Sequence, residues 1–172
     1  MIASLANAEE AERLRKVNDF FNRRILFKDS ITIWADRDYW PTPNETLGIG
    51  AGNCTSYSLA KYYSLKLAGI ANGKLRMVYV RASSGGSPAV SAVAHMVVAY
   101  YAEPGSDPII LDNLISDLRV ASKRTDLYPV FSFNEDGLYD KSNLVNSTPM
   151  ASISRYSKWE SYLKKASEQG FR

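Results

Sequence analysis

Apolar side chains recur every three or four residues in two long stretches of the chain, and this spacing predicts helices. The first stretch predicts a helix from about Ala8 to Arg24, with Asn7 and Glu10 as its expected capping box. The second predicts a helix from Cys54 to about Leu67, and Gly69 is the expected stop signal. These two helices account for most of the apolar periodicity in the first half of the chain.

A third helix is expected near the C-terminus. Ser157 and Glu160 are spaced as a capping box and would begin it. Its apolar face would be formed by Trp159, Tyr162, Leu163 and Ala166.

Runs rich in β-branched and aromatic residues lie between the second and third helices and predict strands. The expected strands are Leu75–Arg81, His95–Ala102, Ile109–Asp112 and Val130–Asn134, with Gly137–Tyr139 as an extension of the sheet. A Gly/Ser/Pro loop over 82–91 and a turn around Pro104 and Gly105 would connect the first three.

The segment from Leu26 to Gly52 shows no clear period, and it is dense in proline and glycine. Such a composition opposes a long helix or a central strand, so we expect an irregular loop. No repeat, low-complexity segment or linker interrupts the pattern. The sequence therefore predicts one α+β domain over residues 1–172, with helices packed on an antiparallel sheet.

Charge and composition exclude several classes of protein. The net charge is only +3 and the basic residues are scattered, which argues against binding to nucleic acid or an anionic membrane. No apolar run approaches the roughly 20 residues that span a bilayer, and residues 1–8 do not resemble a signal peptide. Both interpretations, a cytoplasmic protein and a mature secreted domain, agree with this sequence. One Cys and one His are too few for a structural zinc site.

The single cysteine, Cys54, lies where a nucleophile is expected. It follows three glycines at alternate positions and opens the second predicted helix, with Asn53 as the natural N-cap. The positive end of a helix dipole favours a thiolate, which is the attacking form of cysteine. A small buried apolar residue is the alternative interpretation.

His95 and Asp112 follow Cys54 in a suggestive order. His95 begins one predicted strand and Asp112 ends the next, so antiparallel pairing would bring them side by side. The carboxylate would then orient the imidazole, and the imidazole would activate the thiol. Taken singly, His95 is more often structural and Asp112 more often a turn residue. Papain-like and transglutaminase-like folds use this helix–strand–strand order.

Several motifs together resemble one family, the LapG-type bacterial transglutaminase-like cysteine proteases. The resemblance extends from about Phe20 to Tyr139, and its most specific part is the approach to the cysteine, from Asp38 to Cys54. The other matching segments are Tyr57, 60–62, 67–69, 74–76, 94–97, 111–114 and 128–134.

The resemblance implies a papain-like/transglutaminase-like fold and a periplasmic endopeptidase with Cys54, His95 and Asp112 as its triad. Such proteases release large surface adhesins, and so control biofilm attachment, by cutting near the adhesin N-terminus at a paired-alanine site. The periplasmic domain of an inner-membrane receptor for cyclic di-GMP holds them inactive. We expect these two partners, no nucleic acid and no embedding in the membrane.

One departure from the family concerns calcium. The family has acidic residues around its cysteine, as Asp-Cys-Glu-Asp, and these bind the ion. Here the neighbours are the neutral Asn53, Thr55 and Ser56. Because calcium prefers carboxylate oxygens, we expect weak or no binding and no cofactor. The preceding loop still offers carboxylates at Asp36, Asp38 and Glu45.

The backbone N–H of Cys54 is the expected first donor to the oxyanion, with a second donor near Trp40 or Asn44. Trp40 is interpreted either as a wall of a narrow substrate cleft or as a core anchor of its loop. Two other functions remain open. A degenerate homologue would only bind its receptor or adhesin, and an acyltransferase would pass the thioester to an amine.

Overall fold

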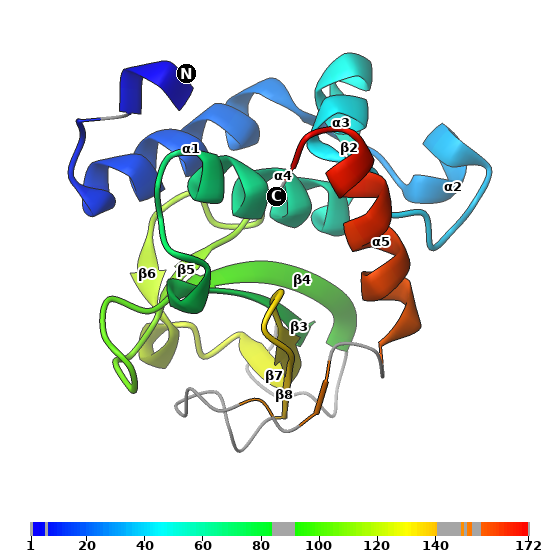
Figure 1. Cartoon of the computed structure of the whole chain (residues 1–172). Coiled ribbons are helices and arrows are strands. Elements are labelled where there is room, and N and C mark those ends of the chain that lie inside the picture. Colours follow the sequence, from blue (N-terminus) through cyan, green and yellow to red (C-terminus); the bar gives the residue numbers. More distant parts are fainter. Residues whose placement is uncertain are drawn as a thin grey trace.

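A layer of helices covers one face of a six-stranded antiparallel sheet in the computed structural model (Figure 1). The structure describes residues 2–5, 7–83, 92–140, 149, 151–152 and 156–171. The helices are η1 (Ile2–Leu5), α1 (Glu10–Arg24), α2 (Ser30–Trp34), α3 (Pro43–Ile49), α4 (Cys54–Leu67), η2 (Asn72–Lys74), η3 (Ala121–Lys123) and α5 (Ser157–Glu168). The strands are β1 (Leu26–Phe27), β2 (Ala51–Gly52), β3 (Leu75–Ser83), β4 (Ala92–Tyr100), β5 (Ile109–Leu111), β6 (Arg119–Val120), β7 (Leu127–Phe133) and β8 (Leu138–Asp140).

The sheet has the strand order β6-β5-β4-β3-β7-β8, and every neighbouring pair is antiparallel. Strand side chains alternate between the two faces, so one apolar set packs under the helices and another lines the opposite face. Met77, Met96 and Phe133 belong to the main core with the helices. Val78 and Val97 belong to a smaller cluster on the other face. The chain therefore has the α+β architecture that the sequence predicts, with helices packed on an antiparallel sheet.

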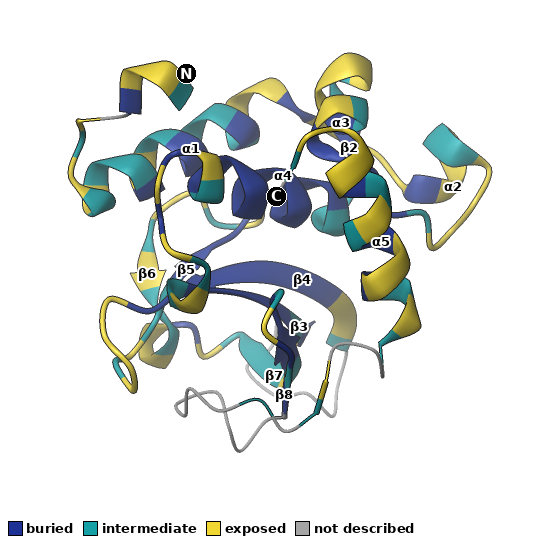
Figure 2. Cartoon of the chain, viewed as in Figure 1, coloured by how far each residue is buried: buried dark blue, intermediate teal, exposed yellow. Residues whose placement is uncertain are grey.

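Helix α4 is the central element of the helical layer. All residues from 56 to 65 are buried, because α1 covers the helix on one side and the sheet on the other. Figure 2 shows α4 buried along most of its length, whereas α1 and α5 each expose one side. A helix enclosed in this way is held by packing on nearly all its faces, so its first residue is fixed relative to the sheet.

Both predicted capping boxes at the chain ends are wrong. The residue before α1 is Glu9, which makes no side-chain cap, and the Glu10 carboxylate instead accepts hydrogen bonds from Lys74 and Tyr100. Tyr156 precedes α5 and also makes no side-chain cap. The stop of α4 is confirmed, since Gly69 has a φ of +90° and directly follows the C-cap residue.

The segment expected to be irregular contains two short helices and a two-residue parallel pair, β1 with β2. Thr42 and Glu45 form a complete capping box, and Pro43 occupies the first turn of α3. Proline suits that position because it needs no N–H partner there. Trp40 lies buried against Phe133 and anchors this segment to the core. The surface hollow that its edge borders lies between this loop and α5, and Cys54 does not line it.

The predicted strands are confirmed with shifted ends. Strand β4 begins three residues before His95, and β7 begins at Leu127 rather than Val130. Strand β6 was not expected, because two residues are too short to show a period. The loop predicted over 82–91 lies outside the described residues from 84 onward. No helix in the described ranges is long and apolar enough to cross a membrane.

Candidate active site

Cys54 lies at the junction between β2 and α4. The Asn53 side chain caps the helix by accepting hydrogen bonds from the Ser56 backbone N–H and hydroxyl, each at 3.2 Å. Gly52 permits this tight approach, because a Cβ at that position would lie 2.3 Å from the Ser56 Cβ. The small residue at 52 and the cap at 53 thus fix where α4 begins.

The first turn of α4 packs against the edge of β4. Pairing between β4 and β5 ends at Val98 and Leu111, which leaves the Met96 backbone beside the helix. The Ser58 hydroxyl donates to the Met96 carbonyl at 2.9 Å, and the Met96 N–H bonds to the Cys54 sulfur. These side chains replace the missing strand partner and bring the thiol next to His95.

The structure brings together the three side chains that the sequence order indicates. His95 Nε2 lies 2.7 Å from Asp112 Oδ1, and the Cys54 thiol is hydrogen-bonded to His95. Because Nε2 is engaged by the carboxylate, Nδ1 is the ring nitrogen left for the sulfur. His95 and Asp112 are buried, whereas Cys54 is partly exposed.

The electrostatics of this group favour separated charges. Burial raises the pKa of the Cys54 thiol, but the hydrogen bond and charge of His95 outweigh it and hold that pKa below its ordinary value. Burial lowers the pKa of His95, but Asp112 and Cys54 outweigh it and raise that pKa to about 9. Burial also opposes ionisation of Asp112, yet His95 and Arg124 lower its pKa to about 2. The arrangement therefore favours a thiolate, an imidazolium and a carboxylate in a row.

Arg124 joins this group although nothing in the sequence indicates it. Its Nη2 donates to Asp112 Oδ2 at 2.7 Å, and its Nε and Nη2 donate to the Asp126 carboxylate at 2.9 and 2.8 Å. The Arg124 side chain is 1% exposed. It follows η3 in an ordinary polar stretch, so only the fold reveals that it reaches the Asp112 carboxylate.

Lys61 is a second site residue that the sequence does not indicate. Its Nζ donates to Asn18 Oδ1 and Asn22 Oδ1 at 2.7 Å each and to the Asp112 carbonyl at 3.0 Å. Burial lowers the pKa of Lys61 to about 7. The Asn22 amide donates to the same carbonyl at 2.8 Å. Lys61 therefore ties α1 and α4 to the backbone of Asp112.

The three neutral residues around Cys54 are hydrogen-bonded within the chain. The Asn53 oxygen is occupied by two donors from Ser56, and Thr55 is hydrogen-bonded to Cys54. Their oxygens are neutral and already paired within the chain. Among the described residues, no group of three His, Cys, Asp or Glu side chains is arranged to hold a metal.

The acidic residues of the preceding loop are engaged elsewhere. The Glu45 carboxylate accepts from Tyr39 and Lys165, and Asp38 pairs with Lys158. Asp36 accepts the backbone N–H of Asp38. These contacts hold the loop against α5 and bring no carboxylate to Cys54.

Comparisons with known proteins point to one family. A family profile described as bacterial transglutaminase-like cysteine proteinase matches residues 2–130. Among solved structures, calcium-bound LapG of Legionella pneumophila matches with a TM-score of 0.78 and 34% identity, over 94% of this chain and 84% of that one. LapG of the same organism matches at 0.81 and 33% identity, and its EGTA-treated form at 0.82 and 34%, each over 96% of this chain and 83% of that one. None of the curated proteins matches the chain in sequence.

Proposed function

The chain belongs to the bacterial transglutaminase-like cysteine proteinases, and from this premise we propose that it is an endopeptidase with Cys54, His95 and Asp112 as its catalytic triad. The observation that carries the proposal is the row of contacts from the thiol through the imidazole to the carboxylate. A buried structural cysteine would need neither an imidazole nor a carboxylate behind it.

The row of contacts supports a two-step acyl-enzyme mechanism. The Cys54 thiolate attacks the scissile carbonyl carbon, and the developing oxyanion is stabilised by the Cys54 backbone N–H at the start of α4. When the C–N bond breaks, the His95 imidazolium gives its proton to the leaving amine. His95 then takes a proton from water as the water oxygen attacks the thioester, and cleavage of the C–S bond releases the carboxylic product and regenerates the thiolate beside the imidazolium.

Asp112 has two roles in this scheme. By accepting the Nε2–H of His95, it selects the tautomer whose Nδ1 faces the sulfur. As a buried carboxylate it also stabilises the imidazolium that forms when the thiol loses its proton.

The substrate and setting follow from the resemblance to LapG-type proteases. We propose that the enzyme works in the periplasm and cuts the N-terminal region of a large surface adhesin near paired alanines, which controls biofilm attachment. Its regulator would be the periplasmic domain of a cyclic di-GMP receptor. Small residues at the cleavage point suit a partly buried nucleophile such as Cys54.

We further propose that the reaction proceeds without calcium. Asn53, Thr55 and Ser56 organise the turn through direct hydrogen bonds, which is the structural task that an ion would otherwise perform. The same loss of acidic residues is what favours the second candidate, a degenerate homologue that binds its receptor or adhesin without cutting.

The test is cleavage of a purified adhesin N-terminal fragment that contains a paired-alanine site. Wild type should cut it equally with and without the chelator EGTA, while C54A and H95A should be inactive and remain folded by circular dichroism. Cleavage by folded C54A would refute the scheme. A wild type that binds the fragment but does not cut it would establish the degenerate homologue, and aminolysis of the thioester by an added amine in place of hydrolysis would indicate an acyltransferase.

A further inference from the structure

Arg124 contacts the triad from the side away from Cys54, and its contacts specify the rotation of the Asp112 carboxylate. Asp112 Oδ2 accepts from Arg124 Nη2 at 2.7 Å. Oδ1 accepts from His95 Nε2 at 2.7 Å and from the Leu114 backbone N–H at 3.1 Å. Each oxygen thus has its own donors, and a rotation about the Cβ–Cγ bond would break contacts on both sides.

The guanidinium is itself held by a second carboxylate. Asp126 receives two parallel N–H donors from Arg124, which is the fork geometry that fixes an arginine most firmly. The Arg124 backbone N–H donates to the Ala121 carbonyl at 2.9 Å, and its carbonyl accepts from Leu127 at 3.1 Å. The turn that carries Arg124 is therefore ordered between η3 and β7.

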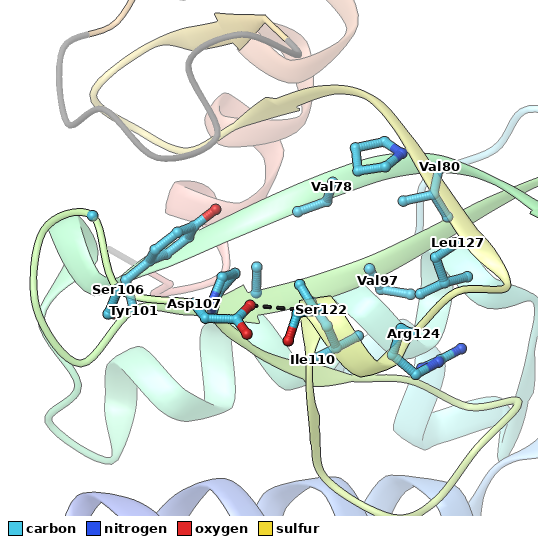
Figure 3. Close-up of a pocket in the computed structure, with 15 residues that line it drawn as sticks. Val78, Val80, Val97, Tyr101, Ser106, Asp107, Ile110, Ser122, Arg124 and Leu127 are labelled. Carbon is cyan, nitrogen blue, oxygen red and sulfur yellow. Dashed lines mark hydrogen bonds between the residues drawn. The ribbon is translucent and has the colours of Figure 1, made fainter.

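The side chain of Arg124 borders a cavity. It lines one end of an apolar cavity of about 430 Å³ on the sheet face opposite the helices, together with Val97 and Leu127. Figure 3 shows the guanidinium directed away from Asp107 and Ser122 on the far side of this cavity. Because the side chain is 1% exposed, its direction is set by its two carboxylate partners rather than by water.

The charges alternate along this row from Asp126 through Arg124, Asp112 and His95 to Cys54. Asp112 is 1% exposed, so a fixed cation beside it has a large effect on its ionisation. We propose that Arg124 is a positioning residue, which holds the Asp112 carboxylate in the orientation that receives the His95 imidazole. This inference rests on the proposed function, because it concerns the same triad.

The rate of alkylation by iodoacetamide, measured against pH, tests this role without any knowledge of the substrate. The chain has one cysteine, so the modified mass reports Cys54 alone. In wild type, alkylation should persist well below the ordinary pKa of a thiol. In R124M, Asp112 loses its fixed cation. The pH below which the alkylation rate of Cys54 falls should then rise by about one unit. Alkylation at pH 6 would then fall roughly tenfold.

Three further variants sharpen the test. R124K retains the charge but not the fork, and should give an intermediate shift. D126N frees the other side of Arg124 and should shift the profile in the same direction by less. R119M removes a nearby arginine whose partner is the exposed Asp117, and it should leave the profile unchanged.

Folding of each variant is checked by circular dichroism. If R124M folds and its alkylation follows the wild-type pH profile, Arg124 has no positioning role. If R124M does not fold, the decision rests on R124K and D126N. Wild-type pH profiles in both of those variants would also exclude the role. H95A separates this result from the proposed function. If H95A and wild type alkylate alike with an ordinary thiol pKa, the triad itself is absent.

Discussion

Asn in place of Asp112 should disable the proposed triad although it replaces only one oxygen by an NH₂ group. Both oxygens of Asp112 face N–H donors, from His95 and Leu114 on one side and from Arg124 on the other. An amide must therefore direct its NH₂ group at a donor in either orientation. If the amide faces His95, Nε2 becomes an acceptor and Nδ1 carries the proton, so the ring cannot accept the thiol proton.

The magnitude follows from the pKa of His95, which Asp112 and Cys54 raise from 6.5 to about 9. At 1.36 kcal/mol for each pKa unit, that difference favours the imidazolium by about 3 kcal/mol. Loss of the carboxylate removes most of this stabilisation, because burial, which lowers the pKa of His95, is then no longer opposed by Asp112. We expect D112N to lower the iodoacetamide alkylation rate of Cys54 at pH 6 by roughly 10²-fold.

The same assay at pH 9.5 provides the control. There the thiol ionises without help, so D112N and wild type should converge. D117N, which removes an exposed carboxylate, should keep the wild-type profile. If folded D112N stays within threefold of wild type at pH 6, Asp112 does not govern the imidazole and the reasoning from its two oxygens is wrong.

Three other predictions concern Lys61, Gly52 and calcium. Because the pKa of Lys61 is lowered to about 7 in the folded chain, the unfolded chain binds more protons between pH 7 and 10.5, so this group makes folding more favourable as pH rises. Urea unfolding should show wild type gaining about 2 kcal/mol over K61M from pH 7 to 9, and no gain would contradict it. G52A should lower the free energy of unfolding by about 1–3 kcal/mol, because its Cβ would strike Ser56. G48A is the control and should be neutral or slightly stabilising, because a Cβ there meets nothing within 4 Å. Equal shifts of the melting temperature in the two variants would contradict this prediction. Calorimetric titration with calcium should give no micromolar site, and binding that N53A abolishes would overturn the proposed independence from calcium.

The sequence predicts those features of the site that are local or follow from chain order. Asn53 before an apolar repeat indicates the start of α4, and the structure confirms this cap. His95 and Asp112 do come together from adjacent antiparallel strands. They meet diagonally beyond the last paired residues, because β5 ends at Leu111. The strand order was therefore predictable, whereas the gap that admits the Cys54 thiol was not.

Lys61 and Arg124, which support Asp112, could not be predicted from the sequence, for physical reasons. Lys61 is a lysine on a helix, which ordinarily faces water, and only the covering of α4 by α1 buries it. Arg124 reaches Asp112 through a turn next to β6, a strand of two residues that leaves no period in the sequence. Both depend on tertiary packing between segments far apart in the chain.

One local signal in the sequence is outweighed by the composition around it. Thr42, Pro43 and Glu45 have the spacing of a capping box with proline in the first turn, and the structure forms it. The density of proline and glycine nearby favours an irregular loop instead. Short helices tolerate such a composition because their ends, rather than their interiors, carry the prolines and glycines.

The most direct test of the proposed triad is the titration of the only imidazole in the chain by NMR. His95 gives a single set of ring resonances, so its pKa can be read without assignment by mutation. The ring should titrate near pH 9 in wild type and at a clearly lower pH in C54A, since the thiolate supports the imidazolium. A ring that titrates near 6.5 in both proteins would contradict the convergence of Cys54, His95 and Asp112.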